Sequence, residues 1–295
     1  MVSIIIPTYN RADIIAKTLD SIKNQTIADW ECLVVDDASS DNIKEVIEEY
    51  SSQDGRFRYI RNRHSKGAPG ARNTGIEQAN GEYVILFDSD NRMHPDCLEK
   101  MMVSLKEGYD VCTCWSDVID FETERSVGAF KWVCEGNIHE KLLEGKCYAD
   151  NNSSLIRRSL LLEYPLDEKV PAYQEWDTHI RISNRAKYVT CKELLVDYLK
   201  GGADAISSSN KKAILGYLYI LSKYKEEWIN KHPKAFEKYC SFLLRLVRKE
   251  YNKTYMASFN ELVPPNMMVA VYAKMYMAVI KSASGRLLRF LKIKH

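Results

Sequence analysis

The chain has 295 residues, of which 45% are hydrophobic, and its formal net charge is +2. This composition excludes an intrinsically disordered chain, and the length suits one large domain or a domain with an extension. The charge is unevenly spread, because residues 1–205 carry 25 Lys and Arg against 35 Asp and Glu, whereas residues 206–295 carry 17 against 5. The basic end is therefore expected either to meet an anionic partner or to present a solvated helical face.

The eight cysteines form no C-x-x-C pair, which argues against a zinc ribbon and favours a reducing compartment. The N-terminus enters an apolar run directly and lacks the basic segment and long apolar core of a signal peptide. No segment reaches the ~18 uncharged apolar residues expected of a membrane-spanning helix. We therefore expect a cytoplasmic protein.

Apolar runs alternate with helical patterns over the first part of the chain. Strands are expected at residues 2–7, 31–36, 57–60, 83–87 and 110–115, and helices at 13–25, 43–50, 71–79 and 95–106. This alternation predicts an α/β fold with a mainly parallel sheet that has helices on both faces. Later strands are expected at 153–156, 188–191 and 194–199, and helices at 160–163, 173–182 and throughout the chain beyond Lys211.

Three of the predicted strands end in polar residues, namely Thr8 to Arg11, Asp36-Asp37, and Asp88 to Asp90. Right-handed crossovers place these strand ends at one edge of a parallel sheet, where ligands of α/β proteins collect. A D-x-D sequence there can offer hard oxygen ligands to one divalent cation and leave coordination positions for a diphosphate. The alternative is a strand end that turns in solvent, with Asp as a turn former.

Four segments in order, VSIIIPTYNR at 2–11, VVDDASSD at 34–41, ARNTGI at 71–76 and DSD at 88–90, resemble the family 2 glycosyltransferases. The resemblance covers about residues 1–205. It implies the A-type glycosyltransferase fold (GT-A) and inverting transfer of a sugar from a nucleotide diphosphate donor, with Mn²⁺ or Mg²⁺. A catalytic domain is therefore expected at 1–205. The remaining residues, 206–295, are expected to form a basic helical extension.

The resemblance assigns the donor site to the three strand ends and to one helix start. These residues are Pro7, Thr8, Tyr9, Asn10, Arg11, Asp36, Asp37, Arg72, Asp88 and Ser89. Tyr9 suits stacking on a planar base, or it is a half-buried loop aromatic. By resemblance Asp37 accepts from the N–H of a uracil ring, and Asp36 does the same or orients the loop. The alternative for both is an Asx turn before the helix start at Ser39.

Arg72 lies in the first turn of a predicted helix, where a guanidinium can meet phosphate oxygens or the base edge. The alternative is a surface arginine. The resemblance makes Asp90 the primary metal ligand, while Asp88 contacts the ribose or the sugar, or reaches the metal through water. The cation would neutralise the charge that builds on the departing diphosphate.

An inverting transfer also needs a carboxylate base within hydrogen-bond reach of the acceptor hydroxyl. Family members carry an acidic residue followed by Trp-Asp at a helix start, with Arg further on, which Glu175-Trp176-Asp177 and Arg181 resemble. Glu175 is therefore the expected base, although the family commonly has Asp there, and Asp177 is the reserve. The alternatives are a first-turn acidic residue favoured by the helix dipole for Glu175 and a helix cap for Asp177.

The third protein ligand of the metal stays open. Some relatives use a histidine in the loop after the last strands, whereas residues 201–209 contain Asp204 and no histidine. His179 is expected to be a structural residue.

The C-terminal end has two apolar runs, 267–273 and 275–280, separated by Lys274. As a helix they would span only ~21 Å, short of a ~30 Å hydrocarbon core. Residues 285–294 interleave cations with Leu and Phe, which suits an amphipathic helix on an anionic membrane. A helix packed on the catalytic domain with its basic face in solvent is the alternative.

The sequence therefore predicts an inverting glycosyltransferase that moves a sugar from a UDP-sugar to a hydroxyl of a glycan or lipid-linked saccharide, in polysaccharide biosynthesis. The expected location is cytoplasmic, or peripheral on the inner face of the cell membrane, with no nucleic-acid partner. A nucleotidyltransferase is the alternative enzyme, but Pro7 to Asn10 lack its Gly-rich basic loop. A silent protein that keeps only the fold would show a damaged metal motif or no carboxylate base, and neither is seen.

Overall fold

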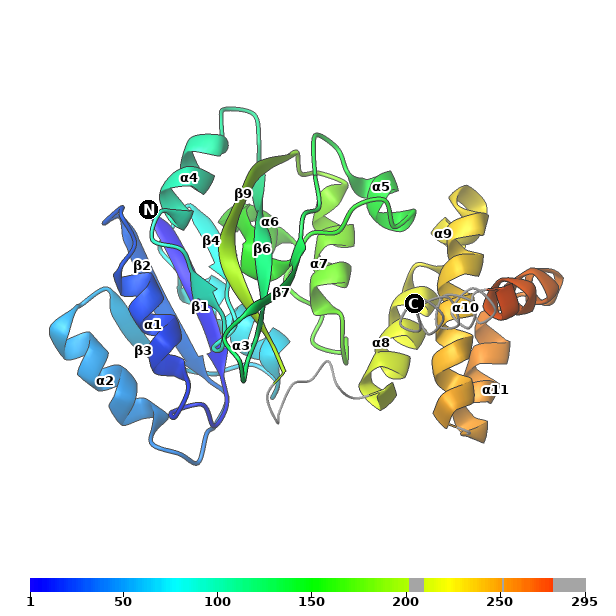
Figure 1. Cartoon of the computed structure of the whole chain (residues 1–295), viewed down its shortest axis with the longest axis horizontal. Coiled ribbons are helices and arrows are strands. Elements are labelled where there is room, and N and C mark those ends of the chain that lie inside the picture. The colour runs from blue at the N-terminus through cyan, green and yellow to red at the C-terminus, as the bar shows by residue number, and fades with distance from the viewer. Residues whose placement is uncertain (202–209, 251, 278–295) are drawn as a thin grey trace, which may run out of the picture. The chain divides into compact units, whose positions relative to one another are not determined.

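The structure is a computed structural model that describes residues 1–201, 210–250 and 252–277. The chain divides into two compact units (Figure 1). The first comprises Met1–Lys169 and Gln174–Ala205, and the second comprises Val170–Tyr173 and Ile206–His295. The second unit thus includes four residues from the middle of the chain.

The first unit is built on one mixed sheet. Its strands are β1 (Val2–Thr8), β2 (Trp30–Asp36), β3 (Phe57–Arg61), β4 (Tyr83–Leu86), β5 (Arg92–Met93), β6 (Val111–Asp120), β7 (Ser126–Phe130), β8 (Ser154–Arg157) and β9 (Tyr188–Lys200). Neighbouring strands follow the order β3-β2-β1-β4-β8-β6-β9-β5. Strand β7 stands outside this order and pairs with β6.

The strands β3, β2, β1 and β4 are all parallel, as the alternation of strands and helices predicts. In this register Ile4 of β1 lies between Cys32 of β2 and Ile85 of β4. All three side chains are fully buried, because helices cover both faces of this part of the sheet. The carboxyl ends of these strands therefore lie along the same edge.

The other half of the sheet departs from the predicted parallel arrangement. Strand β8 is antiparallel to both β4 and β6, and β5 is antiparallel to β9, whereas β6 and β9 are parallel. The two strands predicted at 188–191 and 194–199 form one strand, β9, with an irregular register opposite Trp115. Strands β5 and β7 had not been predicted. The α/β class with helices on both faces is confirmed, and the sheet is mixed.

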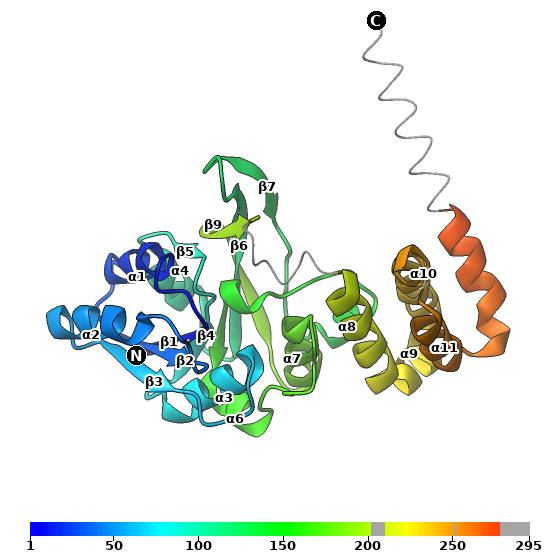
Figure 2. The ribbon, with the colours of Figure 1, turned by 90° about the horizontal axis from the view of Figure 1, so that it is seen from below.

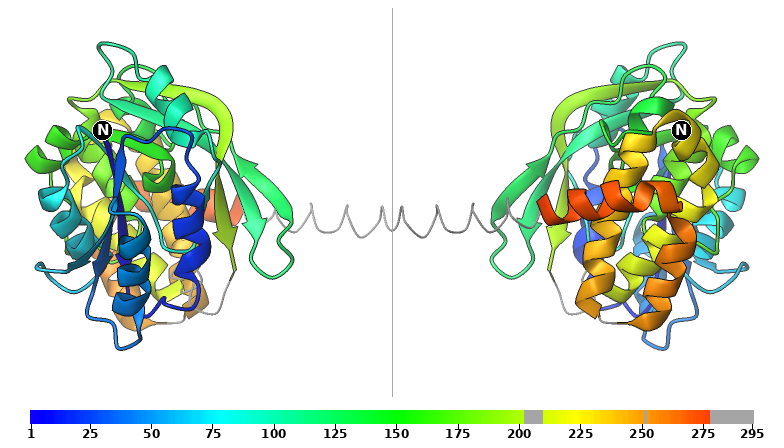
Figure 3. Two further views of the ribbon diagram at one scale, coloured as in Figure 1. Left: turned by 90° about the vertical axis from the view of Figure 1, so that its left-hand side faces the viewer. Right: turned by 90° about the vertical axis from the view of Figure 1, so that its right-hand side faces the viewer.

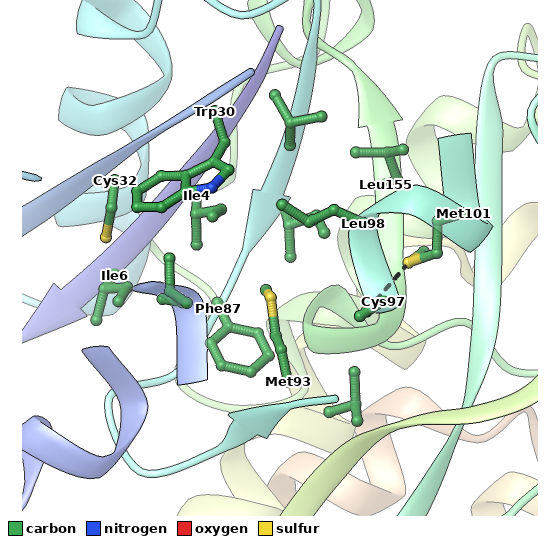
Figure 4. Packing of buried hydrophobic residues seen from close by; sticks show 14 of the residues in the cluster. Ile4, Ile6, Trp30, Cys32, Phe87, Met93, Cys97, Leu98, Met101 and Leu155 are labelled. Atoms are coloured by element: carbon green, nitrogen blue, oxygen red, sulfur yellow. Dashed lines mark hydrogen bonds between the residues drawn. The ribbon is translucent and has the colours of Figure 1, made fainter. Parts of the chain in front are cut away.

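Helices α1 (Ile15–Lys23), α2 (Ile43–Gln53) and α4 (Cys97–Ser104) cover one face of the sheet, and α3 (Ala68–Gln78) and α6 (Arg158–Glu163) cover the other (Figure 2). On the first face Ile4 and Ile6 pack in a core with Phe87, Leu98 and Met101 (Figure 4). The short α5 (His139–Leu143), the 3₁₀ turn η1 (Asn151–Ser153) and α7 (Gln174–Ser183) complete this unit. All eight cysteines are buried and free.

Helix α3 approaches the sheet closely at Gly75. A Cβ atom at this position would lie 2.3 Å from Cγ2 of Ile5 and 3.2 Å from Cγ2 of Val35. These two side chains alternate with Ile4 and Val34 along their strands, so they point to the face opposite α1. The absence of a side chain at Gly75 thus sets how near α3 lies to β1 and β2.

The second unit is helical, as predicted. It contains α8 (Asn210–Lys223), α9 (Lys225–Lys231), α10 (Pro233–Glu250), α11 (Lys253–Leu262) and a further helix at residues 265–277. The right-hand view of Figure 3 shows these helices packed together. The side chains of Trp228, Phe236 and Phe259 are fully buried among them.

Residues 170–173 pack within this second unit. The rings of Tyr173 and Tyr217 lie 5.0 Å apart, and a Cβ atom at Gly216 would lie 2.9 Å from the carbonyl oxygen of Ala172. Tyr173 has a φ of 61°, a left-handed conformation directly before the start of α7.

None of the helices formed by the described residues combines the length and the apolar composition that crossing a membrane requires. The predicted membrane-surface segment at 285–294, and Asp204, lie outside the described residues.

Candidate active site

The loops that follow β1 and β2 are hydrogen-bonded to each other. The amide of Asp37 donates to the carbonyl of Thr8 at 2.9 Å. The amide of Asn10 donates to Oγ of Ser39 at 2.9 Å, and the amide of Ser40 donates to Oδ1 of Asn10 at 2.8 Å. Because the strands are parallel, their two polar ends form one continuous rim.

The carboxylates of Asp36 and Asp37 are buried and hold the loops around them. Asp36 accepts from the hydroxyl of Tyr59 at 2.7 Å and from the amide of Ser39 at 2.9 Å. Asp37 accepts from Nδ2 of Asn62 and from the amide of Gly67, both at 2.7 Å. Burial and the Asp36 carboxylate raise the pKa of Tyr59 to about 12. Each carboxylate oxygen has a second lone pair, so a contact with a base remains compatible with these bonds.

Tyr9 is an exposed aromatic residue of this rim, with 45% of its surface accessible. The ammonium of Lys66 lies 4.4 Å from the centre of its ring. Thr8 is buried, and its hydroxyl has no hydrogen-bond partner among the described residues. The exposed ring of Tyr9 is thus available for stacking on a ligand.

Arg72 is enclosed and links two parts of the site. Its Nη2 donates to Oδ1 of Asp88 at 2.6 Å, and its Nη1 donates to Oε1 of Gln174 at 2.6 Å. Only 8% of its side chain is accessible, so it is not the surface arginine that the sequence left as an alternative. The guanidinium joins the end of β4 to the first turn of α7.

Asp90 lies beside Asp88 in a half-buried position. Burial and the neighbouring charge of Asp88 raise the pKa of Asp90 to about 6, although the cation of Arg11 opposes this. Ser89 is buried between them, and its carbonyl accepts from the hydroxyl of Thr18 at 2.9 Å. Two crowded carboxylates supply the hard oxygen ligands that Mg²⁺ and Mn²⁺ prefer.

The Asp88–Asp90 pair fits a divalent cation that completes its coordination with water or with a diphosphate. Across the described residues, no group of three or more His, Cys, Asp or Glu side chains is arranged to hold a metal ion. The third protein ligand that the sequence left open is thus not found in the described part of the chain.

Glu175 faces the same space as Asp88 and Asp90. Its Oε1 accepts a hydrogen bond of 2.6 Å from the hydroxyl of Tyr148. Burial, Glu175 and Asp88 together raise the pKa of Asp150 to about 7. Burial and four carboxylates, those of Asp150, Asp88, Glu175 and Asp90, raise the pKa of Tyr198 to about 12. All four carboxylates thus lie near enough to Tyr198 to act on it electrostatically.

Asp177 is buried within the fold, whereas Glu175 is partly exposed. Oδ2 of Asp177 lies 3.9 Å from Nη1 of Arg181. Arg181 also donates to the carbonyl of Pro165. His179 is fully buried beside the hydroxyl of Tyr188, and burial lowers its pKa to about 3. These residues tie α7 into the fold, so Glu175 is the member of this motif that faces the site.

The sequence did not indicate Tyr148, Asp150, Asn152 or Tyr198. Asn152 donates from Nδ2 to Oδ2 of Asp88 at 2.9 Å and accepts from the Asp88 amide at 2.7 Å. The polar run before β8 was the available signal for Asp150 and Asn152. Tyr198 carried no such signal, since tyrosine is common in strands.

Comparison with known proteins identifies the class of this site. Residues 3–163 match the family model described as Glycosyl transferase family 2. The GalNAc(5)-diNAcBac-PP-undecaprenol beta-1,3-glucosyltransferase of Campylobacter jejuni is 39% identical over 108 residues, which are 36% of this chain and 35% of that protein. The match thus spans about a third of the length of that relative.

A second relative matches over most of both chains. The UDP-Glc:alpha-D-GlcNAc-diphosphoundecaprenol beta-1,3-glucosyltransferase WfgD of Escherichia coli is 29% identical over 228 residues, 77% of this chain and 87% of that protein. Among solved structures, S. aureus TarS 1-349 in complex with UDP-GlcNAc superposes with a TM-score of 0.65 at 18% identity, covering 93% of this chain and 88% of that chain. This likeness confirms the GT-A-like fold.

Proposed function

The chain belongs to glycosyl transferase family 2, and we propose that it transfers a sugar from a UDP-sugar, with inversion, to a hydroxyl group of a glycan or lipid-linked saccharide. The observation that carries this proposal is the position of Glu175. It lies close to Asp88, because Arg72 donates hydrogen bonds both to Asp88 and to Gln174, the residue directly before Glu175. An inverting transfer requires a base for the acceptor hydroxyl and stabilisation of the departing diphosphate. Glu175 suits the first role, and the Asp88–Asp90 pair with a bound cation suits the second.

The donor nucleotide is proposed to bind at the rim formed by Pro7 to Arg11 and by Asp36 and Asp37. The exposed ring of Tyr9 would stack on the base. Asp37 would accept from the N–H of uracil with the lone pairs that Asn62 and Gly67 leave free. The names of the E. coli relative and of the S. aureus complex, UDP-Glc and UDP-GlcNAc, support a UDP-sugar.

Asp90 and Asp88 would hold Mn²⁺ or Mg²⁺, because their crowded, half-buried oxygens fit a hard cation. When bound, the cation would neutralise charge on the departing diphosphate. Arg72 keeps Asp88 in place through a bond of 2.6 Å, and it adds a positive charge beside the carboxylate pair. Ser89 lies between the two carboxylates in the chain, and the cation of Arg11, in the loop after β1, acts on Asp90.

Glu175 is proposed to accept the proton of the acceptor hydroxyl as that oxygen attacks the anomeric carbon. The acceptor would be a saccharide linked to a lipid diphosphate, as the names of both bacterial relatives suggest. The excess of cations in residues 206–295, 17 against 5 acidic residues, supports a place for this end at an anionic membrane surface.

A donor screen tests the proposal. The full chain is mixed with UDP-, GDP- and dTDP-sugars and Mn²⁺, and release of the nucleotide diphosphate is measured with undecaprenyl-diphosphate saccharides as acceptors. We expect release from a UDP-sugar, and release from none of the donors would overturn the proposal.

Two substitutions then separate the roles of the carboxylates. Asp90→Ala is expected to abolish transfer and leave the circular dichroism spectrum unchanged, and metal-dependent transfer by this variant would contradict the metal assignment. Glu175→Gln is expected to reduce kcat by about 10²–10⁴-fold, the contribution of a positioned base. If Asp150→Asn had that effect and Glu175→Gln did not, Asp150 would be the base.

A further inference from the structure

One short segment contacts both halves of the candidate site. Residues 148–152 lie between α5 and β8 and carry Tyr148 at one end and Asn152 at the other. Tyr148 bonds to Glu175, on α7, and Asn152 bonds to Asp88, at the end of β4. Glu175 and Asp88 are far apart in sequence, so the segment bridges two elements that the chain does not connect directly.

The bridge is fixed at several points. The carbonyl of Tyr148 accepts from Sγ of Cys134 at 3.5 Å, and the Ala149 side chain is buried. The amide of Asn152 donates to Oδ1 of Asp150 at 2.8 Å, and the hydroxyl of Ser154 donates to the carbonyl of Asp150 at 2.5 Å. These bonds involve the backbone, so they hold the segment in a defined conformation.

At the Asp88 end, the carboxamide of Asn152 makes two bonds. Its Nδ2 donates to Oδ2 of Asp88 at 2.9 Å, and its Oδ1 accepts from the Asp88 amide at 2.7 Å. Together with Arg72 on Oδ1, both carboxylate oxygens of Asp88 are held. This end of the bridge thus fixes the donor-side carboxylate.

At the other end, the hydroxyl of Tyr148 donates to Oε1 of Glu175 at 2.6 Å. A hydrogen bond to an ionised carboxylate is short and about twice as strong as one between neutral groups. Glutamate has one more rotatable bond than aspartate, so its carboxylate needs a partner to stay in one place. Tyr148 supplies that partner, and it belongs to the same segment that binds Asp88 through Asn152.

We propose that Tyr148 is a positioning residue that orients the carboxylate of Glu175 toward the acceptor hydroxyl, at a distance from Asp88 that the 148–152 bridge sets. This inference rests on the proposed function. Asp150 of the bridge and Tyr198 of β9 also lie near Glu175, and Arg72 donates to the adjacent Gln174. All of them remain when Tyr148 is changed to phenylalanine.

Tyr148→Phe removes the donated hydrogen bond and keeps the ring. We expect kcat to fall about 10- to 100-fold, as for the loss of a hydrogen bond to a charged group, while KM for the donor changes less than about twofold. Initial rates over a range of donor concentrations at saturating acceptor separate the two parameters.

Tyr50→Phe is the matched control, since the hydroxyl of Tyr50 also donates to a carboxylate, Oδ1 of Asp20, at 2.8 Å and outside the site. This variant is expected to keep the kcat and KM of the wild type. If Tyr148→Phe did the same, the inference would fail while the proposed function stood. If the wild type itself released no nucleotide diphosphate, both would fail.

A double-mutant cycle shows whether Tyr148 acts through Glu175. The shorter side chain of Glu175→Asp is expected to lose the contact, so adding Tyr148→Phe in that background should cost no further activity. An equal loss from Tyr148→Phe in both backgrounds would mean that the tyrosine acts independently of Glu175, and would overturn the inference. UDP binding by calorimetry checks that each variant retains a folded donor site.

Discussion

Asp150 has a carboxyl group whose protonation changes with folding. Burial, Glu175 and Asp88 raise its pKa to about 7, well above the value of about 3.9 for an exposed Asp. Between these values the folded chain binds more protons than the unfolded chain, so the stability that this group contributes is lost as the pH rises through that window.

Asp150→Asn should remove this dependence. We expect the stability advantage of the variant over the wild type to grow by roughly 1–2 kcal/mol between about pH 5 and about pH 8. This is less than the shift of about three pKa units would give, because the residue is partly accessible to solvent. Urea unfolding in the presence of a chelator measures the difference. Asp13→Asn, at an exposed carboxyl, is the control, and a wild-type slope in Asp150→Asn would contradict the prediction.

Residues of the site differ in how visible they are in the sequence. Asp88 and Asp90 follow a continuous apolar run, and Glu175 stands in a Trp-Asp motif at a helix start, so their local sequence marks them. Tyr148 and Asn152 lie in a loop, and their roles depend on partners that only tertiary structure brings near. The burial that raises the pKa of Asp90 together with the charge of Asp88 likewise cannot be read from the neighbouring sequence.

At the scale of elements, α3 depends on its contact with the sheet through Gly75. A Cβ atom there would meet Ile5 at 2.3 Å, so the helix has to shift or the strand has to yield. Because α3 also carries Arg72, a shift of this helix would reach the donor-side carboxylate Asp88. The packing of one face of the sheet is therefore linked to the geometry of the site.

Gly75→Ala is expected to lower the free energy of unfolding by about 1–2 kcal/mol, because overpacking outweighs the gain in helix propensity of about 1 kcal/mol. KM for the donor should rise in the same variant. Gly128→Ala in β7 is the matched control, since nothing lies within 4 Å of the Cβ position there. Equal stability of the two variants in urea would show that α3 is not tightly packed at this point.

Strands with continuous apolar sequences were predictable, since β1, β2 and β4 are buried on both faces. Strand β5 has two residues, too few for a pattern, and every side chain of β7 is exposed, so burial gives it no periodicity. The direction of β8 follows from the path of the chain after β7 and not from its own residues. A local pattern therefore predicted the parallel half of the sheet better than the mixed half.

At the scale of the whole molecule, the charge separation between residues 1–205 and 206–295 has a measurable consequence. The full chain is expected to bind vesicles that contain anionic lipid at least about tenfold more strongly than zwitterionic ones, and to lose this preference at high salt. Sedimentation with vesicles of both compositions measures it. Equal binding to both would remove the support for a membrane-surface location.

Changing Arg286, Arg289, Lys292 and Lys294 to Gln in the full chain is the matching control. If residues 285–294 supply the attraction, this variant should lose the preference for anionic vesicles while its transfer to a water-soluble acceptor stays at the wild-type level. Loss of both the vesicle preference and the transfer activity would instead indicate that these residues are needed for the fold.

The membership of Val170–Tyr173 in the helical unit bears on how such chains recombine in evolution. These residues come directly before Gln174 and Glu175, and Ala172 and Tyr173 pack against Gly216 and Tyr217. A gene fusion that joined residues 1–205 to a foreign domain would leave this segment without its packing partners. The helical extension and the segment before α7 are therefore expected to be inherited together, so a swap of the extension alone would carry a cost at the proposed base.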